Sequence, residues 1–279
     1  MNFENLPEWN YKSEELDDST EKDRDERPPL KGNTRRIPMG LYEEPWDKVT
    51  DAYGSAELTP FYIEGLGSDN KADREFAIFG LYSATTHQGS VYESARMAIP
   101  FLVDMLKAEK EDDTILASHF LARIAVGENH FIRSPKYVDR CRSEYFNDVF
   151  EFKNILRAFY EETDNPEIMR LLCFYPHELP DYVLPKKKIK DEILATKLIV
   201  QGFIAAERNL KEHKTEVEEY MLESDSLLVR LSAAVCLAYS NLADDYCKKL
   251  LLHLSEMDLN YTPWVWEFDA SQLAKYAWI

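Results

Sequence analysis

The chain has 279 residues, which is ample for a buried core, and its nine glycines are too few for a loop-rich β architecture. Its 51 acidic and 33 basic residues give a formal net charge of −18, which argues against nucleic acid or an anionic membrane surface as the main partner. The remaining class is an acidic, mainly α-helical globular protein.

The first 45 residues are predicted to form an acidic, irregular N-terminal arm. Residues 12–27 carry eight acids and four bases around almost no apolar residue, and Pro28 and Pro29 prevent a helix from continuing. The few apolar residues near the start leave two alternatives open, which are docking of the arm against the body and disorder throughout.

Apolar segments of helical length follow from residue 46 onward, and we expect a single domain over 46–279. Three of these segments, 76–82, 168–175 and 231–239, are apolar almost all round, which predicts helices packed on several sides. Polar capping residues mark their starts, namely Ser68 or Asp69, Asn165, and Ser224 or Asp225.

A basic run interrupts this pattern. Lys186, Lys187, Lys188 and Lys190 follow Pro185. We interpret the stretch near 184–190 as a solvated connection that enters a helix over about 190–210.

The three apolar segments share an internal repeat, in which Asp or Asn lies five residues before an arginine and a small residue lies three after it. The polar pairs are Asp69 and Arg74, Asn165 and Arg170, and Asp225 and Arg230. A copy without the arginine is expected near residue 117, which gives steps of about 43, 53 and 60 residues, the first of them within the range of helical repeats. The small residues are expected where helices approach closely.

This pattern resembles the HEAT repeat, and residues 50–107 are similar to bacterial HEAT-repeat proteins. The similar stretches are Ala52-Tyr53-Gly54-Ser55-Ala56 through Leu66, Arg74 to Leu81, and His87 to Tyr92 leading into Ala98-Ile99-Pro100-Phe101-Leu102. The resemblance implies a HEAT-like α-solenoid of antiparallel helix pairs, in which the acid and the arginine tie neighbouring repeats together. Such solenoids typically hold another macromolecule on an extended face.

The turn from His87 to Glu93 is the most prominent polar cluster, because it joins an imidazole, an amide, a hydroxyl and a phenol. Three interpretations are open: a structural turn, partner binding through His87, Gln88, Tyr92 and Glu93, and catalysis. We favour the structural turn, since no nucleophile elbow and no carboxylate that would orient His87 is evident.

Two tryptophans, Trp264 and Trp266, belong to an aromatic cluster near the C-terminus. The cluster either covers the last repeat of a solenoid or forms a docking surface for a partner.

No cofactor and no metal site is expected. Gly65-Leu66-Gly67 lacks the third glycine and the preceding strand of a dinucleotide fingerprint. His177-Glu178 is one pair, which is too few ligands for a metal centre. The four cysteines form no C-x-x-C pair and are expected to be reduced.

We therefore expect a non-enzymatic protein-binding module with a basic partner, for example an immunity protein that sequesters a basic toxin. The alternatives are a small-molecule-binding protein or enzyme with a pocket near His87, Tyr92 and Glu93, and a self-associating scaffold. A cytoplasmic location without a membrane partner is expected, because the first residues lack a secretory signal and the apolar stretch 231–243 is too short to cross a bilayer.

Overall fold

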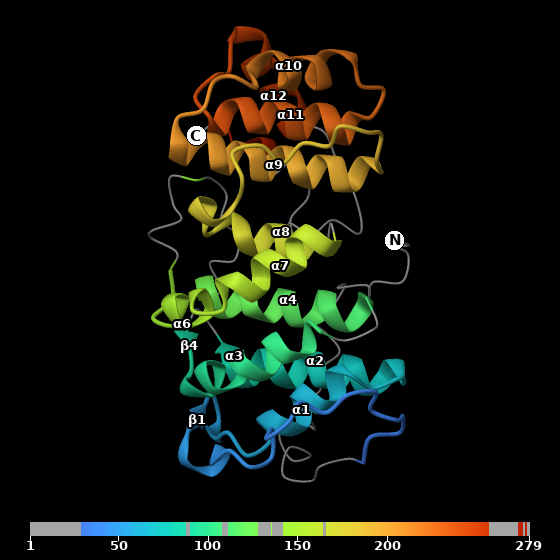
Figure 1. The fold of residues 1–279 in the computed structure, drawn as a ribbon, viewed down its shortest axis with the longest axis vertical. Helices are drawn as coiled ribbons and strands as arrows, with labels where there is room; N and C mark the ends of the chain where they lie inside the picture. The colour runs from blue at the N-terminus through green and yellow to red at the C-terminus, as the bar shows by residue number, and fades with distance from the viewer. Residues whose placement is uncertain are drawn as a thin grey trace. The chain divides into compact units, whose positions relative to one another are not determined.

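The computed structural model of the chain describes residues 29–87, 90–107, 111–127, 135, 142–163, 166–256, 273–275 and 277 (Figure 1). These residues are mainly helical, which confirms the all-α class. They belong to two compact units, Met1–Phe120 and Leu121–Ile279, and the division falls within one helix. The expected single domain over 46–279 stays a prediction.

The first unit contains four helices, a short 3₁₀ turn and two β-hairpins among its described residues. In chain order the elements are η4 (Trp46–Lys48), β1 (Thr50–Asp51), β2 (Gly54–Ser55), α1 (Thr59–Leu66), α2 (Lys71–Thr85), β3 (Thr86–His87), β4 (Ser90–Val91), α3 (Glu93–Met105) and α4 (Glu111–Val126), of which α4 continues into the second unit. Each hairpin is antiparallel, with Thr50 opposite Ser55 in the first and Thr86 opposite Val91 in the second.

Helix α2 begins at an asparagine cap, so the predicted start at Ser68 or Asp69 is wrong by one or two residues. The side chain of Asn70 accepts hydrogen bonds from the backbone N–H groups of Ala72 at 2.9 Å and of Asp73 at 3.4 Å. These bonds satisfy two of the N–H groups that the first turn of a helix leaves without a partner.

Helices α1 and α2 approach each other closely at two glycines. A Cβ atom at Gly65 would lie 2.8 Å from the Cβ of Ala77, the small residue of the first repeat copy. A Cβ atom at Gly80 would overlap the ring of Tyr62. The close approach expected at Ala77 is therefore present, and Gly80 provides a second point of contact.

The described end of the N-terminal arm, residues 29–45, is irregular and is bound to α1, α2 and α3. Its backbone N–H groups at Gly32 and Asn33 donate to the carboxylates of Asp73 at 2.8 Å and of Asp69 at 2.9 Å. Farther along, Arg36 forms an ion pair with Asp104 on α3 at 2.8 Å. We call residues 31–36 the strap.

The carboxylate of Asp73 is the main anchor of the strap, because it is 7% exposed and also accepts a hydrogen bond from the hydroxyl of Ser68 at 2.9 Å. Burial by itself would raise the pKa of Asp73, but the hydrogen bonds from Gly32, Lys31 and Ser68 and the charge of Lys31 outweigh it and lower that pKa below its ordinary value. The ionised form of Asp73 therefore stabilises the fold.

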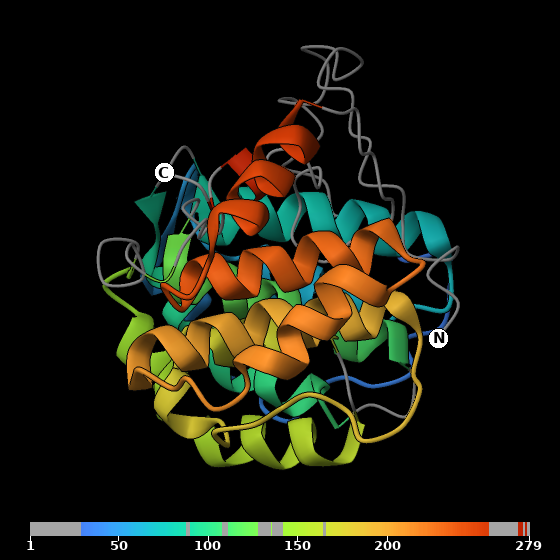
Figure 2. The same cartoon turned by 90° about the horizontal axis from the view of Figure 1, so that it is seen from above.

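The second unit contains the remaining described elements. These are α6 (Phe146–Phe150), α7 (Lys153–Thr163), α8 (Pro166–Cys173), η7 (Pro176–Glu178), α9 (Asp191–Arg208), α10 (Lys214–Glu223), α11 (Leu227–Tyr239) and α12 (Asp245–Ser255). Helix α9 contacts α8 and α11, and α11 also contacts α10 and α12 (Figure 2). The helix expected over about 190–210 is confirmed as α9.

The helix starts in this unit agree only in part with the sequence. Helix α8 begins at Pro166, as a proline at the first helical position predicts, while the expected cap Asn165 lies outside the described residues. Helix α11 begins after Ser226, so the predicted start at Ser224 or Asp225 is early by one or two residues. The hydroxyl of Ser224 instead accepts a hydrogen bond from the backbone N–H of Ser226 at 3.2 Å and shapes the turn before the helix.

The interface between α9 and α11 forms the centre of this unit. A Cβ atom at Gly202 of α9 would lie 3.0 Å from the Cα of Cys236 of α11, so the two helix backbones are nearly in contact. Phe203 and Tyr239 meet edge to face beside this point, with ring centroids 5.3 Å apart. Both rings are buried.

We predict that Gly80→Ala destabilises the first unit. Alanine usually stabilises a helix by about 0.5–1 kcal/mol relative to glycine, but overlap with the Tyr62 ring should reverse the sign and lower the free energy of unfolding by about 1–3 kcal/mol. Urea denaturation measures the change. In Tyr62→Leu protein the same substitution should cost less, and an equal cost in both backgrounds would contradict the proposed clash.

A second prediction concerns pH. A carboxylate with a lowered folded-state pKa stabilises the fold above its ordinary pKa and loses this contribution as the pH falls through the folded-state value. Asp73→Asn should therefore lower the free energy of unfolding by about 1–3 kcal/mol at pH 7, and the difference from wild type should shrink below about pH 4. Asp47→Asn, at an exposed position, is the matched control in urea denaturation at both pH values. Equal behaviour of the two variants would contradict the assignment.

Candidate binding groove

A groove of about 600 Å³ lies within the second unit, between the connection that precedes α9 and the α10–α11 pair. Residues 185–189 and the first turns of α9 form one wall. The face of α10 and residues 224–226 form the other wall. The connection expected near 184–190 is therefore part of the lining of a concave site.

The first wall is mainly basic. Lys186, Lys187 and Lys188 line the groove, and all three are exposed, as expected for a solvated connection; Asp191 at the start of α9 is the one carboxylate on this side. Ile189 and Leu194 lie on the same side and are half-buried. The wall therefore presents ammonium groups beside a small apolar surface.

A buried amide of α9 fixes the chain that leads into this wall. Gln201 is 1% exposed, and its Nε2 donates to the backbone carbonyl of Asp181 at 2.8 Å. Its Oε1 accepts from the backbone N–H of Val183 at 2.9 Å. One side chain thereby satisfies two backbone groups of a segment that has no helix or strand of its own.

The last residue of α9 holds the same segment farther upstream. Arg208 donates from Nη2 to the backbone carbonyls of Pro176 and Leu179, both at 2.6 Å, and forms an ion pair with Asp181. Bonds from a guanidinium to several acceptors position a loop well, because the donors form a rigid fork. The segment that leads into the basic wall is thus anchored to α9 at two points.

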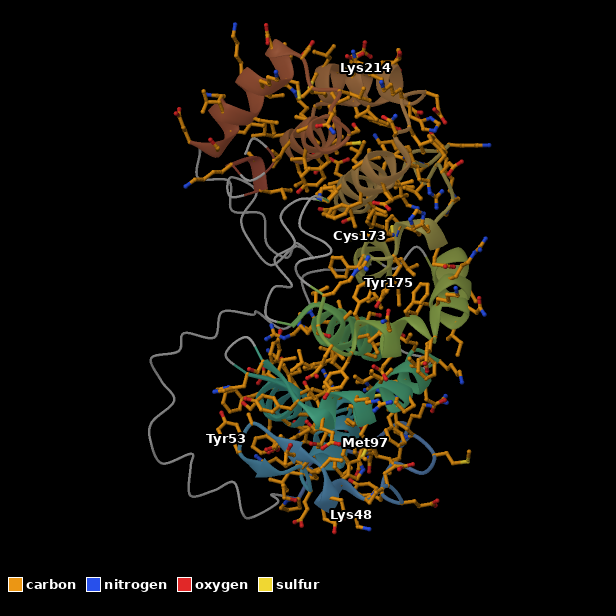
Figure 3. All side chains as sticks on the ribbon, turned by 90° about the vertical axis from the view of Figure 1, so that its left-hand side faces the viewer. Lys48, Tyr53, Met97, Cys173, Tyr175 and Lys214 are labelled. Atoms are coloured by element: carbon orange, nitrogen blue, oxygen red, sulfur yellow. The ribbon has the colours of Figure 1, made fainter. Side chains whose placement is uncertain are left out.

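The second wall is acidic. Glu216, Glu219 and Glu223 of α10 line the groove at positions i, i+3 and i+7, which lie on one face of a helix. Asp225 follows the helix and is exposed. At a rise of about 1.5 Å per residue, the row of glutamates extends for about 10 Å. Lys214, labelled on α10 in Figure 3, forms an ion pair with Glu218 at 3.3 Å.

Two tyrosines report the electrostatics of this wall. The hydroxyl of Tyr182 donates to the carboxylate of Glu216 at 2.6 Å. Burial, and then that hydrogen bond and the charge of Glu216, raise the pKa of Tyr182 well above its ordinary value. Burial and the charges of Glu216 and Glu219 also raise the pKa of Tyr220, which lines the groove. The wall is therefore a region of negative potential.

The opposite charges of the two walls are not paired with each other in the described part of the chain. Lys186, Lys187 and Lys188 form no ion pair there, and neither do the three carboxylates of Glu219, Glu223 and Asp225. The groove therefore presents both signs of charge to an incoming molecule, and Tyr220 of α10 lines it beside the carboxylates.

The predicted site residues of the His87 turn lie in the first unit, away in sequence from the groove. The expected turn between two apolar helices is confirmed as the β3–β4 hairpin between α2 and α3. The ring of His87 lies beside the ring of Tyr53, with centroids 5.4 Å apart, and Tyr53 is labelled in Figure 3. The backbone N–H of Tyr92 donates to the carbonyl of Thr85 at 3.0 Å, and Glu93 begins α3 with its side chain exposed.

The other predicted partner-binding residues, Gln88, Trp264 and Trp266, lie outside the described residues.

The repeat residues contact backbone groups within their own helix pairs. Arg74 donates to the carbonyl of Ser68 at 2.7 Å, and Arg230 donates to the carbonyl of Met221 at 2.9 Å. Each arginine thus binds a carbonyl near the end of the preceding helix. Asp69 holds the strap, as described above, and Asp225 lines the groove. The side chains of Asn165 and Arg170 are not among those described.

Three of the four cysteines, Cys173, Cys236 and Cys247, are described, and all three are buried. Burial, followed by the charges of Asp244 and Glu218, raises the pKa of Cys247 to about 12. The fourth, Cys141, lies outside the described residues.

Among the residues that are described, no group of three histidine, cysteine or acidic side chains is arranged to hold a metal ion.

No protein-family model, no curated protein and no solved structure matches this chain. Within the described ranges, no helix combines the length and the apolar character needed to cross a membrane. The interpretation of the groove rests on its own geometry and charge.

We predict that Gln201→Leu loosens the basic wall. The substitution leaves the Val183 N–H and the Asp181 carbonyl without their buried partner, which should cost about 1–3 kcal/mol of stability. Hydrogen exchange of the Val183 amide should accelerate by about tenfold or more, since about 1.4 kcal/mol corresponds to a factor of ten in an opening equilibrium.

The control for this measurement is Thr196→Ala. Thr196 is also buried on α9, but its hydroxyl donates only to the carbonyl of Glu192 within the same helix. Unchanged exchange at Val183 in Gln201→Leu, or equal acceleration in both variants, would contradict the anchoring role.

Proposed function

We propose that this protein is a non-enzymatic binding module for a basic protein, and that the partner docks on the groove of the second unit. The observation that carries the proposal is the row of carboxylates along α10 and Asp225, three of which have no ion-pair partner among the described residues. Unpaired carboxylates on a rigid helix are suited to receive lysine or arginine side chains of another protein.

The net charge of the whole chain also favours a basic protein as the partner. A formal net charge of −18 attracts a basic protein from a distance and repels nucleic acid. Electrostatic steering raises association rates by about 10- to 1,000-fold at low salt. A module that sequesters a basic toxin, in the manner of an immunity protein, gains speed of association from such a field.

We further propose that the helix pairs belong to a HEAT-like α-solenoid. Helices α1 and α2 are joined by four residues and α10 and α11 by three, and both pairs are in contact. In the second unit α9 contacts α8 on one side and α11 on the other, which is the layering that a solenoid requires. Stacked pairs expose an edge for binding, and the groove lies beside one such pair.

The proposal predicts a steep dependence on salt and a specific loss on charge reversal. Glu219→Lys/Glu223→Lys should weaken the complex with the basic partner by more than tenfold at low salt, because close charge pairs across protein interfaces couple by about 1.5 kcal/mol or more. The partner is isolated by affinity capture, purified, and titrated by calorimetry at several salt concentrations.

The matched control is Glu43→Lys/Glu44→Lys, which changes the net charge equally at exposed positions of the first unit. It should weaken binding only slightly, through the long-range field. Equal losses in the two variants would place the interface elsewhere. Salt-insensitive affinity, or the absence of a protein partner, would contradict the proposed function.

A further inference from the structure

The groove has opposite charges on its two walls, which a purely basic partner segment would not complement. Such a segment could pair with Glu219 and Glu223, but its charges would also face the ammonium groups of the other wall. Like charges placed together across an interface cost affinity. The lysine wall therefore needs an anionic group from the same partner.

We propose, resting on the function proposed above, that the groove recognises a short protein segment with a cationic side chain and a carboxylate on opposite sides of an apolar residue. The cation pairs with the carboxylates of α10 and Asp225. The carboxylate of the segment pairs with the lysines at 186–188.

The apolar residue of the segment has a place between the walls. Ile189, Leu194 and Tyr220 line the groove and are half-buried, so that part of each side chain stays accessible. A tyrosine that lines such a groove is well suited as an anchor, because it offers a large apolar face and few rotatable bonds.

The size and lining of the groove favour a protein segment over a small molecule. Its volume of about 600 Å³ is within the usual range for ligand sites, but small-molecule pockets are mostly apolar with a few polar groups. Here three lysines and five carboxylates form most of the lining. The row of glutamates, about 10 Å long, matches about three residues of an extended chain at about 3.3 Å per residue.

The basic wall is also held in place before the partner arrives. Gln201 fixes the chain at 181–183, and Arg208 fixes it at 176–181, so the lysines follow an anchored segment. Preorganisation of this kind reduces the ordering that binding requires.

The test uses the full chain and short fluorescein-labelled peptides of defined charge. The mixed peptide is Lys-Lys-Leu-Glu-Glu, made also in the reversed order, and the comparison peptides are Lys-Lys-Leu-Gln-Gln and Gln-Gln-Leu-Glu-Glu. Fluorescence anisotropy at low salt should show the better mixed peptide binding about tenfold or more tightly than either comparison peptide.

Substitution of the lysine wall gives the sharpest outcome, because attraction by net charge alone and recognition of mixed charge predict different results for the mixed peptide. Lys186→Gln/Lys187→Gln/Lys188→Gln makes the protein more acidic, so attraction by net charge alone would strengthen binding of the basic peptide and would leave binding of the mixed peptide, whose side-chain charges cancel, unchanged. We expect instead that the mixed peptide loses about tenfold in affinity while the basic peptide gains. The control, Lys48→Gln/Lys248→Gln/Lys249→Gln, makes the same change in net charge at exposed positions outside the groove and should leave the preference for the mixed peptide intact.

Each result that would overturn the inference can be told apart from failure of the proposed function. If the basic peptide binds most tightly, or if the lysine variant does not weaken binding of the mixed peptide, the inference is wrong and an acidic docking site remains. If no peptide binds at millimolar concentration, the inference is also wrong, while the salt and charge-reversal titrations of the purified partner decide the proposed function separately.

Discussion

The close contact between α9 and α11 is the constraint on which the groove depends. At Gly202 a Cβ atom would lie 3.0 Å from the Cα of Cys236, so a larger residue would fit only if one of the two helices shifted by a few tenths of an ångström. Through Gln201 and Arg208, helix α9 binds the segment 176–183 that precedes the basic wall, and α11 contacts α10 with its acidic face. The contact between α9 and α11, which itself contains no charge, therefore links the elements that carry the two walls.

This arrangement separates the parts that stabilise the unit from the parts that are available for binding. Glu216 is already engaged by the hydroxyl of Tyr182, which ties α10 to the segment before the basic wall. Glu219 and Glu223, one and two turns farther along, have no such partner in the described residues. Glu216 thus helps to hold α10 in place, while Glu219 and Glu223 supply the unpaired negative charge.

The sequence reveals the local features of this fold better than its long-range ones. The small residue Ala77, the proline start of α8 and the extent of α9 follow from spacing and helix-end chemistry. The cap of α2 was misplaced because Ser68, Asp69 and Asn70 are all good capping residues, and only the fold shows that Asp69 binds the strap instead.

The groove itself was not evident from the sequence for a related reason. A lysine run after a proline has the composition of a solvated connection, and its exposure agrees with that interpretation. The 18 residues of α9 separate the lysines from α10 along the chain, so the sequence gives no sign that the two are neighbours. Only the packing of α9 against α11 brings the lysines and α10 to the same groove. Periodicity assigns Glu216, Glu219 and Glu223 to one helical face, but it gives no information about what that face is opposite to.

Under the proposed function, the lysine wall would also make so acidic a protein selective. A surface with only negative charge binds any polycation, and discrimination between partners then requires a feature that penalises the wrong one. Three unpaired ammonium groups beside the carboxylates provide such a penalty, because a uniformly basic segment meets repulsion where a segment of mixed charge finds a partner. In this proposal net charge brings candidates to the surface quickly, and the arrangement of charge within the groove determines which of them stays bound.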